Sequence, residues 1–123
     1  MQIITQIFKP LKDSRSSRNK KHKFLEIIIL SILAVLSGAD SYDEIEQFGK
    51  EKINFLKKFL ELRNGIPSHD TINRLFQLLN PSEFEKCFIQ FTDYLKTSGV
   101  LKDHIAIDGK TTRGSKDTFT RLF

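Results

Sequence analysis

One long apolar run constrains the fold of this chain more than any other feature of its sequence. The run extends from Phe24 to Leu36 and contains two polar residues, Glu26 and Ser31. Its 13 residues fall short of the roughly 20 that a membrane-spanning helix needs. Apolar side chains at nearly every position are typical of a helix that other helices cover on all sides. The run therefore predicts the central helix of a bundle and disfavours a membrane role.

Signals for helix starts and ends predict further helices after this run. Gly38 is a typical left-handed C-terminal stop, Ser41 with Glu44 fits a capping box, and Ser68 and Asn80 are typical N-cap residues. Apolar residues recur at helical spacing after each start signal. We expect helices at 42–49, from 53 to the turn at 64–65, at 69–79 and at 81–98. Residues 24–99 are therefore predicted to form a mainly α-helical domain, a compact bundle of four or five short helices.

Positive charge is concentrated near the N-terminus. Residues 9–23 hold seven basic side chains and one acidic one, a net charge of +6, whereas residues 24–99 hold eight basic and eleven acidic ones, a net charge of −3. A cationic segment suits a polyanion such as DNA, because each neutralised phosphate releases condensed counterions. Residues 1–23 are thus interpreted as a basic N-terminal arm, with Lys20, Lys21 and Lys23 as candidate DNA contacts. The alternative is a flexible N-terminus whose charges are solvated.

The use of cysteine and histidine limits the chemistry and the compartment. The single Cys87 leaves no partner for an internal disulfide, and the first ten residues lack the pattern of a secretory signal. A cytoplasmic location is the expectation. The three histidines, His22, His69 and His104, have no partners at the spacing of metal ligands.

A polar ridge on the helix predicted after Ser68 is the first candidate site. His69, Asn73 and Gln77 recur every four residues, with Arg74 beside them. This helix follows a tight turn and an earlier helix, which is the outline of a helix-turn-helix reader, and its amide and guanidinium groups could bond base edges or phosphates. The alternative is the ordinary solvated face of an amphipathic helix.

A second candidate site follows Gly99, where the sequence pattern changes. Residues 104–108 are predicted to form a short β-strand that ends at Asp108, with Lys110 and Arg113 nearby. A carboxylate at a strand end is well placed to hold Mg²⁺, which prefers oxygen ligands. Asp108 followed by Gly109 is also typical of a hairpin turn.

These motifs, taken in order, resemble one family. The sequence LSG at 36–38 is followed by EIEQFG at 44–49, GIPSHDT at 65–71 and IAIDGKTTRGS at 105–115. This succession is similar to the H-repeat-associated family of bacterial insertion-sequence transposases, over about residues 8–117. The resemblance implies a helical N-terminal domain followed by an RNase-H-like domain of the DDE type, which cuts and rejoins DNA with paired divalent metal ions. By position, Asp108 matches the first catalytic carboxylate of that family.

The resemblance also implies what the chain lacks. The second Asp and the Glu of the family lie downstream, whereas this sequence ends at Phe123. Residues 100–123 are therefore interpreted as the truncated start of the catalytic domain. With one carboxylate present, stable Mg²⁺ binding and DNA cleavage are not expected.

Three functional interpretations stay open on this basis. The chain is the N-terminal part of a transposase that binds the terminal repeats of its element, a stand-alone DNA-binding regulator, or a relic that acts at most as a dimerisation module. DNA is the expected partner, a homo-oligomer is left open, and neither a membrane nor a small-molecule substrate is expected.

Overall fold

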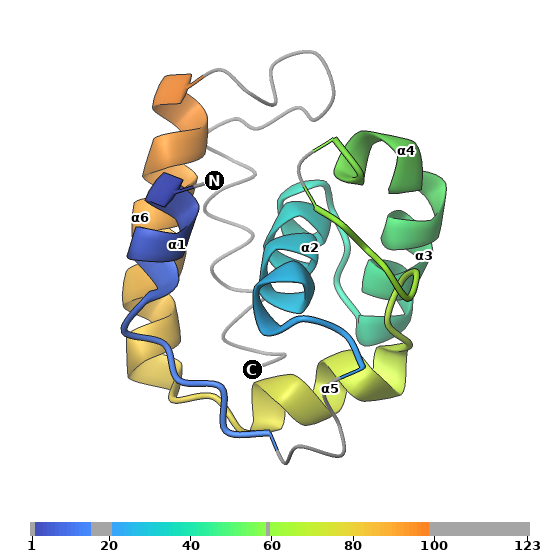
Figure 1. The fold of residues 1–123 in the computed structure, drawn as a ribbon, viewed down its shortest axis with the longest axis horizontal. Helices are drawn as coiled ribbons and strands as arrows, with labels where there is room; N and C mark the ends of the chain where they lie inside the picture. Colours follow the sequence, from blue (N-terminus) through green and yellow to red (C-terminus); the bar gives the residue numbers. More distant parts are fainter. Residues whose placement is uncertain (1, 16–20, 59, 99–123) are drawn as a thin grey trace.

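The computed structural model describes residues 2–15, 21–58 and 60–98, and these segments contain six helices and no strand. The helices are α1 (Gln2–Phe8), α2 (Phe24–Leu36), α3 (Tyr42–Glu51), α4 (Ile53–Leu56), α5 (His69–Gln77) and α6 (Pro81–Ser98) (Figure 1). The predicted helical class is confirmed, and the described residues of 24–98 hold five helices, α2 to α6, as the four or five expected there; α1 is an additional helix before them. The predicted strand at 104–108 and the whole segment 100–123 lie outside the described residues.

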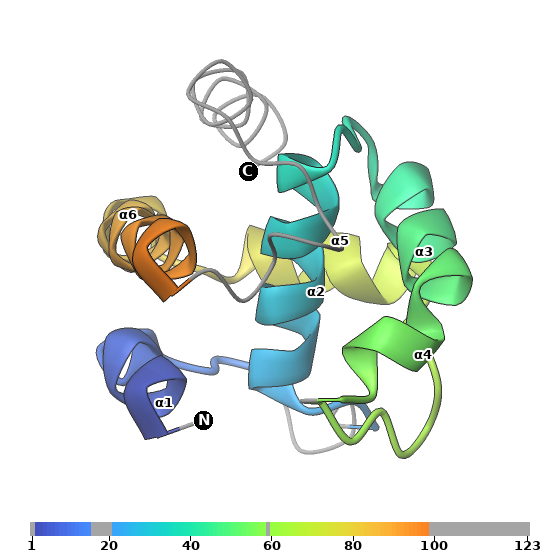
Figure 2. The same ribbon diagram turned by 90° about the horizontal axis from the view of Figure 1, so that it is seen from above.

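Helix α2 is the centre of the molecule, as the apolar run predicts. Figure 2 shows α1 and α6 on one side of it, α3 and α4 on the other, and α5 crossing below. All positions from Glu26 to Leu36 are buried. Ser31 satisfies its hydroxyl within the helix by donating to the carbonyl of Ile27 at 2.7 Å. No described helix is long and apolar enough to cross a membrane.

The N-terminal segment supplies the helix that the sequence pattern did not predict. Helix α1 packs along α6, and the phenyl rings of Phe8 and Phe91 lie 5.4 Å apart between centroids. Ile4, Phe8 and Leu11 are all buried in the core. The first part of the segment interpreted as a basic arm, residues 4–11, is therefore packed on the core and does not extend into solvent. Ile4 and Phe8, four residues apart, form the apolar face of the docked helix α1, and Leu11 is buried in the turn that follows it.

Side-chain caps begin the helices where the sequence predicts them. Ser41 accepts a hydrogen bond from the Glu44 amide at 3.2 Å, and Glu44 accepts one from the amide of Asp40 at 2.6 Å. Ser68 accepts from the Thr71 amide at 3.2 Å. Helix α2 also ends as predicted, with Gly38 in a left-handed conformation at φ 111°.

One predicted helix end is wrong, and another is displaced by two residues. Helix α3 continues past Gly49 to Glu51, because Gly49 serves close packing and not termination. A Cβ atom at Gly49 would lie 2.8 Å from Cγ2 of Ile66 and 3.1 Å from Cδ1 of Leu30. The helix that begins at Ile53 ends at Leu56, and the described residues 57–58 and 60–68 lie in a connection to α5 instead of a helix and a tight turn.

Buried Glu26 explains why this connection is not helical. Its Oε2 atom accepts hydrogen bonds from the amides of Glu61 at 2.8 Å and Leu62 at 3.0 Å. Leu62 has a φ of 47°, in the left-handed region. The carboxylate thus replaces the helical partners of two amides and fixes the connection against the start of α2.

Candidate nucleic-acid interface

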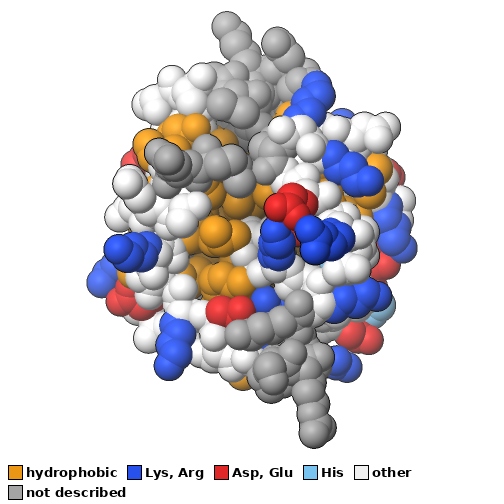
Figure 3. Space-filling model, viewed as in Figure 1, with side chains coloured by type: hydrophobic (Ala, Val, Ile, Leu, Met, Phe, Trp, Pro, Cys, Tyr) orange, Lys and Arg blue, Asp and Glu red, His pale blue; other side chains and the backbone are white. Residues whose placement is uncertain are grey.

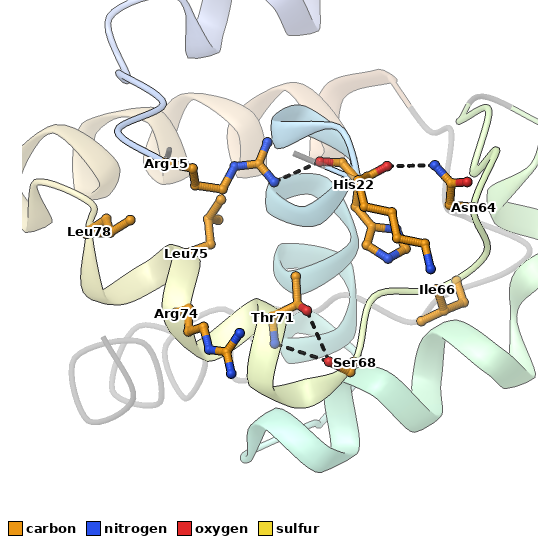
Figure 4. Close-up of a pocket in the computed structure, with 10 residues that line it drawn as sticks. Arg15, His22, Asn64, Ile66, Ser68, Thr71, Arg74, Leu75 and Leu78 are labelled. Atoms are coloured by element: carbon orange, nitrogen blue, oxygen red, sulfur yellow. Dashed lines mark hydrogen bonds between the residues drawn. The ribbon is translucent and has the colours of Figure 1, made fainter. Parts of the chain in front are cut away.

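A pocket of about 360 Å³ opens between the segment before α2, residues 64–68 of the connection and α5 (Figure 4). It brings together residues from segments that are far apart in the sequence. The described lining residues are Arg15, Lys21, His22, Asn64, Ile66, Ser68, Thr71, Arg74, Leu75 and Leu78. Four of them are basic or imidazole side chains, and none is acidic. The pocket is therefore suited to an anionic ligand.

Two side chains from other segments hydrogen-bond to the backbone carbonyls of Lys21 and His22. The Arg15 guanidinium donates to the His22 carbonyl at 2.8 Å, and the Asn64 side-chain amide donates to the Lys21 carbonyl at 2.6 Å (Figure 4). Arg15 is itself held by Asp13 at 3.0 Å. These bonds fix the position of Lys21 while its own side chain stays exposed.

The surroundings of His22 are electropositive. Burial, followed by the charges of Lys21 and Arg15, lowers the pKa of His22 below its ordinary 6.5, while Glu26 acts in the opposite direction. Within the described segments, no ion pair joins Lys21 or Arg74 to a carboxylate. Their charges are available to a ligand. Figure 3 shows that Lys and Arg side chains occur on both flanks of one face of the molecule, with a hydrophobic strip between them.

The residues of the predicted polar ridge lie in different environments. His69 lies against α3, with its Nδ1 atom 3.0 Å from the Glu46 carboxylate and 3.2 Å from that of Asp43. Its backbone amide also donates to Glu46 at 2.7 Å. The hydrogen bond with Glu46 is the main reason that the pKa of His69 is raised. These carboxylates would repel a phosphate, so the His69 end of the ridge is poorly suited to DNA.

The Glu46–His69 contact depends on pH in both directions. The bond to Lys50, followed by the bonds to His69, lowers the pKa of Glu46 from 4.5 to about 2. A lowered carboxyl pKa stabilises the fold above its ordinary value, and a raised histidine pKa does so below 6.5. The contact is therefore strongest between pH 4.5 and 6.5, and it weakens as the pH moves out of this window on either side.

The rest of the ridge is exposed and internally bonded. The Gln77 side-chain amide donates to the Asn73 side chain at 3.1 Å, and Gln77 also bonds the side chain of Tyr42 on α3. Arg74 instead lines the pocket with Lys21. The long connection before α5 also differs from the short turn of a helix-turn-helix unit.

The other predicted site residues are placed as follows. Lys23 forms an exposed ion pair with Glu61 at 2.8 Å. Lys20, Asp108, Lys110 and Arg113 lie outside the described residues. Within the described part of the chain, no group of three His, Cys, Asp or Glu side chains could hold a metal ion. Sequence reasoning missed Arg15, His22 and Asn64 as pocket residues, and no local motif marks them.

Comparison with known proteins gives a consistent result. The family model described as DDE_Tnp_1-associated matches residues 5–92. The "H repeat-associated putative transposase YhhI" of Escherichia coli (strain K12) is 45% identical over 85 residues, which are 69% of this chain and 22% of that protein. The "H repeat-associated putative transposase YbfD" of the same organism is 43% identical over 86 residues, 69% of this chain and 33% of that protein.

A third relative comes from another organism. An "Uncharacterized protein in dhlA 3'region" of Xanthobacter autotrophicus is 43% identical over 79 residues, 64% of this chain and 27% of that protein. The chain thus spans about a fifth to a third of the length of these relatives. No solved structure matches the chain significantly.

Proposed function

The chain belongs to the DDE_Tnp_1-associated family, and on that premise we propose that it is the DNA-binding N-terminal part of a DDE-type insertion-sequence transposase. The curated relatives named as transposases support this proposal. The transposase activity that these names give to the whole proteins is assigned to this chain only as part of the proposal.

The observation that carries DNA binding is the convergence of Lys21 and Arg74 on one pocket without an acidic lining residue. Cationic side chains neutralise phosphates, and such contacts position a protein on the duplex without reading its sequence. Lys20, Lys23, Lys110 and Arg113 would add to this charge in the same proposal. We leave His69 out because of the carboxylates around it, and we assign no reading role to Asn73 or Gln77.

We further propose that this polypeptide binds DNA but does not cut it. By family position, Asp108 is the first catalytic carboxylate, and Mg²⁺ is the hard cation that such oxygen ligands suit. A polypeptide of residues 1–123 supplies one such carboxylate, whereas a paired-metal site needs several. We therefore expect this polypeptide to bind DNA without cleaving it.

Salt-dependent binding tests the proposal. Fluorescence anisotropy of a duplex that contains the terminal repeats flanking the gene gives the affinity at several salt concentrations. Each lost phosphate contact lowers the salt slope by about 0.9, so the double variant Lys21→Gln/Arg74→Gln should lower it by about 2.

The matched control is Lys52→Gln/Lys96→Gln, which removes the same charge from exposed positions outside the pocket. Its slope should stay close to that of the wild type. Equal slopes for the two double variants would refute the pocket as the contact site. Self-association that is insensitive to salt, without any affinity for DNA, would favour a dimerisation module and refute the proposed function.

A further inference from the structure

The pocket has an apolar side that phosphate binding alone does not require. Ile66, Leu75 and Leu78 line it among the cationic residues, with Leu75 next to Arg15 and Arg74 in Figure 4. Leu78 is 50% exposed, which is unusual for a leucine in this fold, since the described large hydrophobic side chains are mostly buried. A hollow whose lining combines cationic side chains with aliphatic carbon fits a ligand that is both anionic and flat or apolar.

The volume narrows the class of ligand. About 360 Å³ lies near the lower end of the range of small-ligand pockets. The stacked bases of a duplex cannot enter a hollow of this size, whereas one nucleotide carries a phosphate and an apolar base face in a single unit. Resting on the proposed function, we propose that the pocket receives one unpaired nucleotide of a DNA strand, with its phosphate at Lys21 and Arg74 and its base against Leu75 and Leu78.

The neutral polar groups of the lining suit the edge of a base. The His22 ring points from the start of α2 toward Ser68 and Thr71 (Figure 4). Its lowered pKa leaves the ring neutral at pH 7, so one ring nitrogen donates and the other accepts a hydrogen bond. The bonds from Arg15 and Asn64 hold this segment before any ligand arrives. A preformed site of this kind avoids the cost of ordering on binding.

Three matched duplexes test the proposal by anisotropy with the full chain. The first is blunt, the second carries one unpaired nucleotide at its end, and the third carries an abasic unit there, which keeps the phosphate and removes the base. We expect the second duplex to bind on the order of five-fold more tightly than the other two, the gain from covering a few tens of Å² of apolar side chain. Leu78→Ala should abolish this gain.

Ile89→Ala is the matched control, because Ile89 is exposed to a similar extent, 46% compared with 50%, on a different helix. It should leave the five-fold gain intact. Thermal unfolding by circular dichroism verifies that both variants are folded. An NMR titration with free deoxyadenosine monophosphate measures whether the pocket also binds a nucleotide that is not part of a strand. The proposal requires the nucleotide in a strand to bind more tightly than the free one.

The outcomes separate this inference from the proposed function. Equal affinity for the blunt and the unpaired duplex would overturn the inference and leave DNA binding intact. Equal affinity for the abasic and the unpaired duplex would show that the pocket takes a phosphate only, which also overturns it. Absence of affinity for all three duplexes would instead refute the proposed function.

Discussion

The buried carboxylate of Glu26 gives the sharpest test of how the pocket is built. It accepts the amides of Glu61 and Leu62 through one oxygen atom. Glu26→Ala would leave both amides without partners inside the protein. An unsatisfied buried group costs about 1–3 kcal/mol, and the Glu61 amide is only partly buried. We therefore expect a loss of about 3 kcal/mol in the free energy of unfolding.

Glu26→Gln separates the hydrogen bonds from the charge. Its carbonyl oxygen can still accept both amides, but without the added strength of an ionised acceptor. We expect this variant to lose only about 1 kcal/mol. Chemical denaturation measures both variants, with Asp93→Ala on the exposed side of α6 as the control. A loss in Glu26→Ala no larger than that in Asp93→Ala would refute the reasoning.

Three further changes test other parts of the structure. Phe8→Ala should cost about 3 kcal/mol in unfolding experiments, whereas a change near zero would contradict the docking of α1 on α6. Gly49→Ala should lower stability by about 1 kcal/mol, because overpacking against Ile66 outweighs the gain in helix propensity; a stabilised variant would contradict the close approach. In an NMR titration, the pKa of His69 should lie above 6.5 and return toward that value in Glu46→Gln, and an unchanged pKa would show that the contact is not formed in solution.

Local patterns were sufficient to predict much of the fold. Helix α2 follows from the density of its apolar residues, and the starts of α3 and α5 follow from the side chains of Ser41 and Ser68. These features depend on residues within one or two turns of each other. The apolar spacing of Ile4 and Phe8 in α1 and of Leu11 after it was equally local, but the surrounding charge of the N-terminal segment favoured another interpretation.

Features that depend on tertiary contacts could not be predicted in this way. The connection after α4 is fixed by Glu26, which lies on another helix. Gly49 was interpreted as a helix end because glycine often ends helices. Its actual role is to let α3 approach Ile66 in the connection before α5, and this contact is visible only in the folded structure. Lys21 and Arg74 approach one pocket only after α2 and α5 have packed, and no spacing in the sequence indicates that they meet.

Mapping of the DNA contacts by NMR tests the central claim most directly. The amide resonances of the chain are followed while a duplex of the terminal repeats is added. We expect the largest shifts at Lys21, His22, Asn64 and Arg74, the residues that line or hold the pocket. Shifts confined to the face of α3 and α4, with none around the pocket, would contradict the claim.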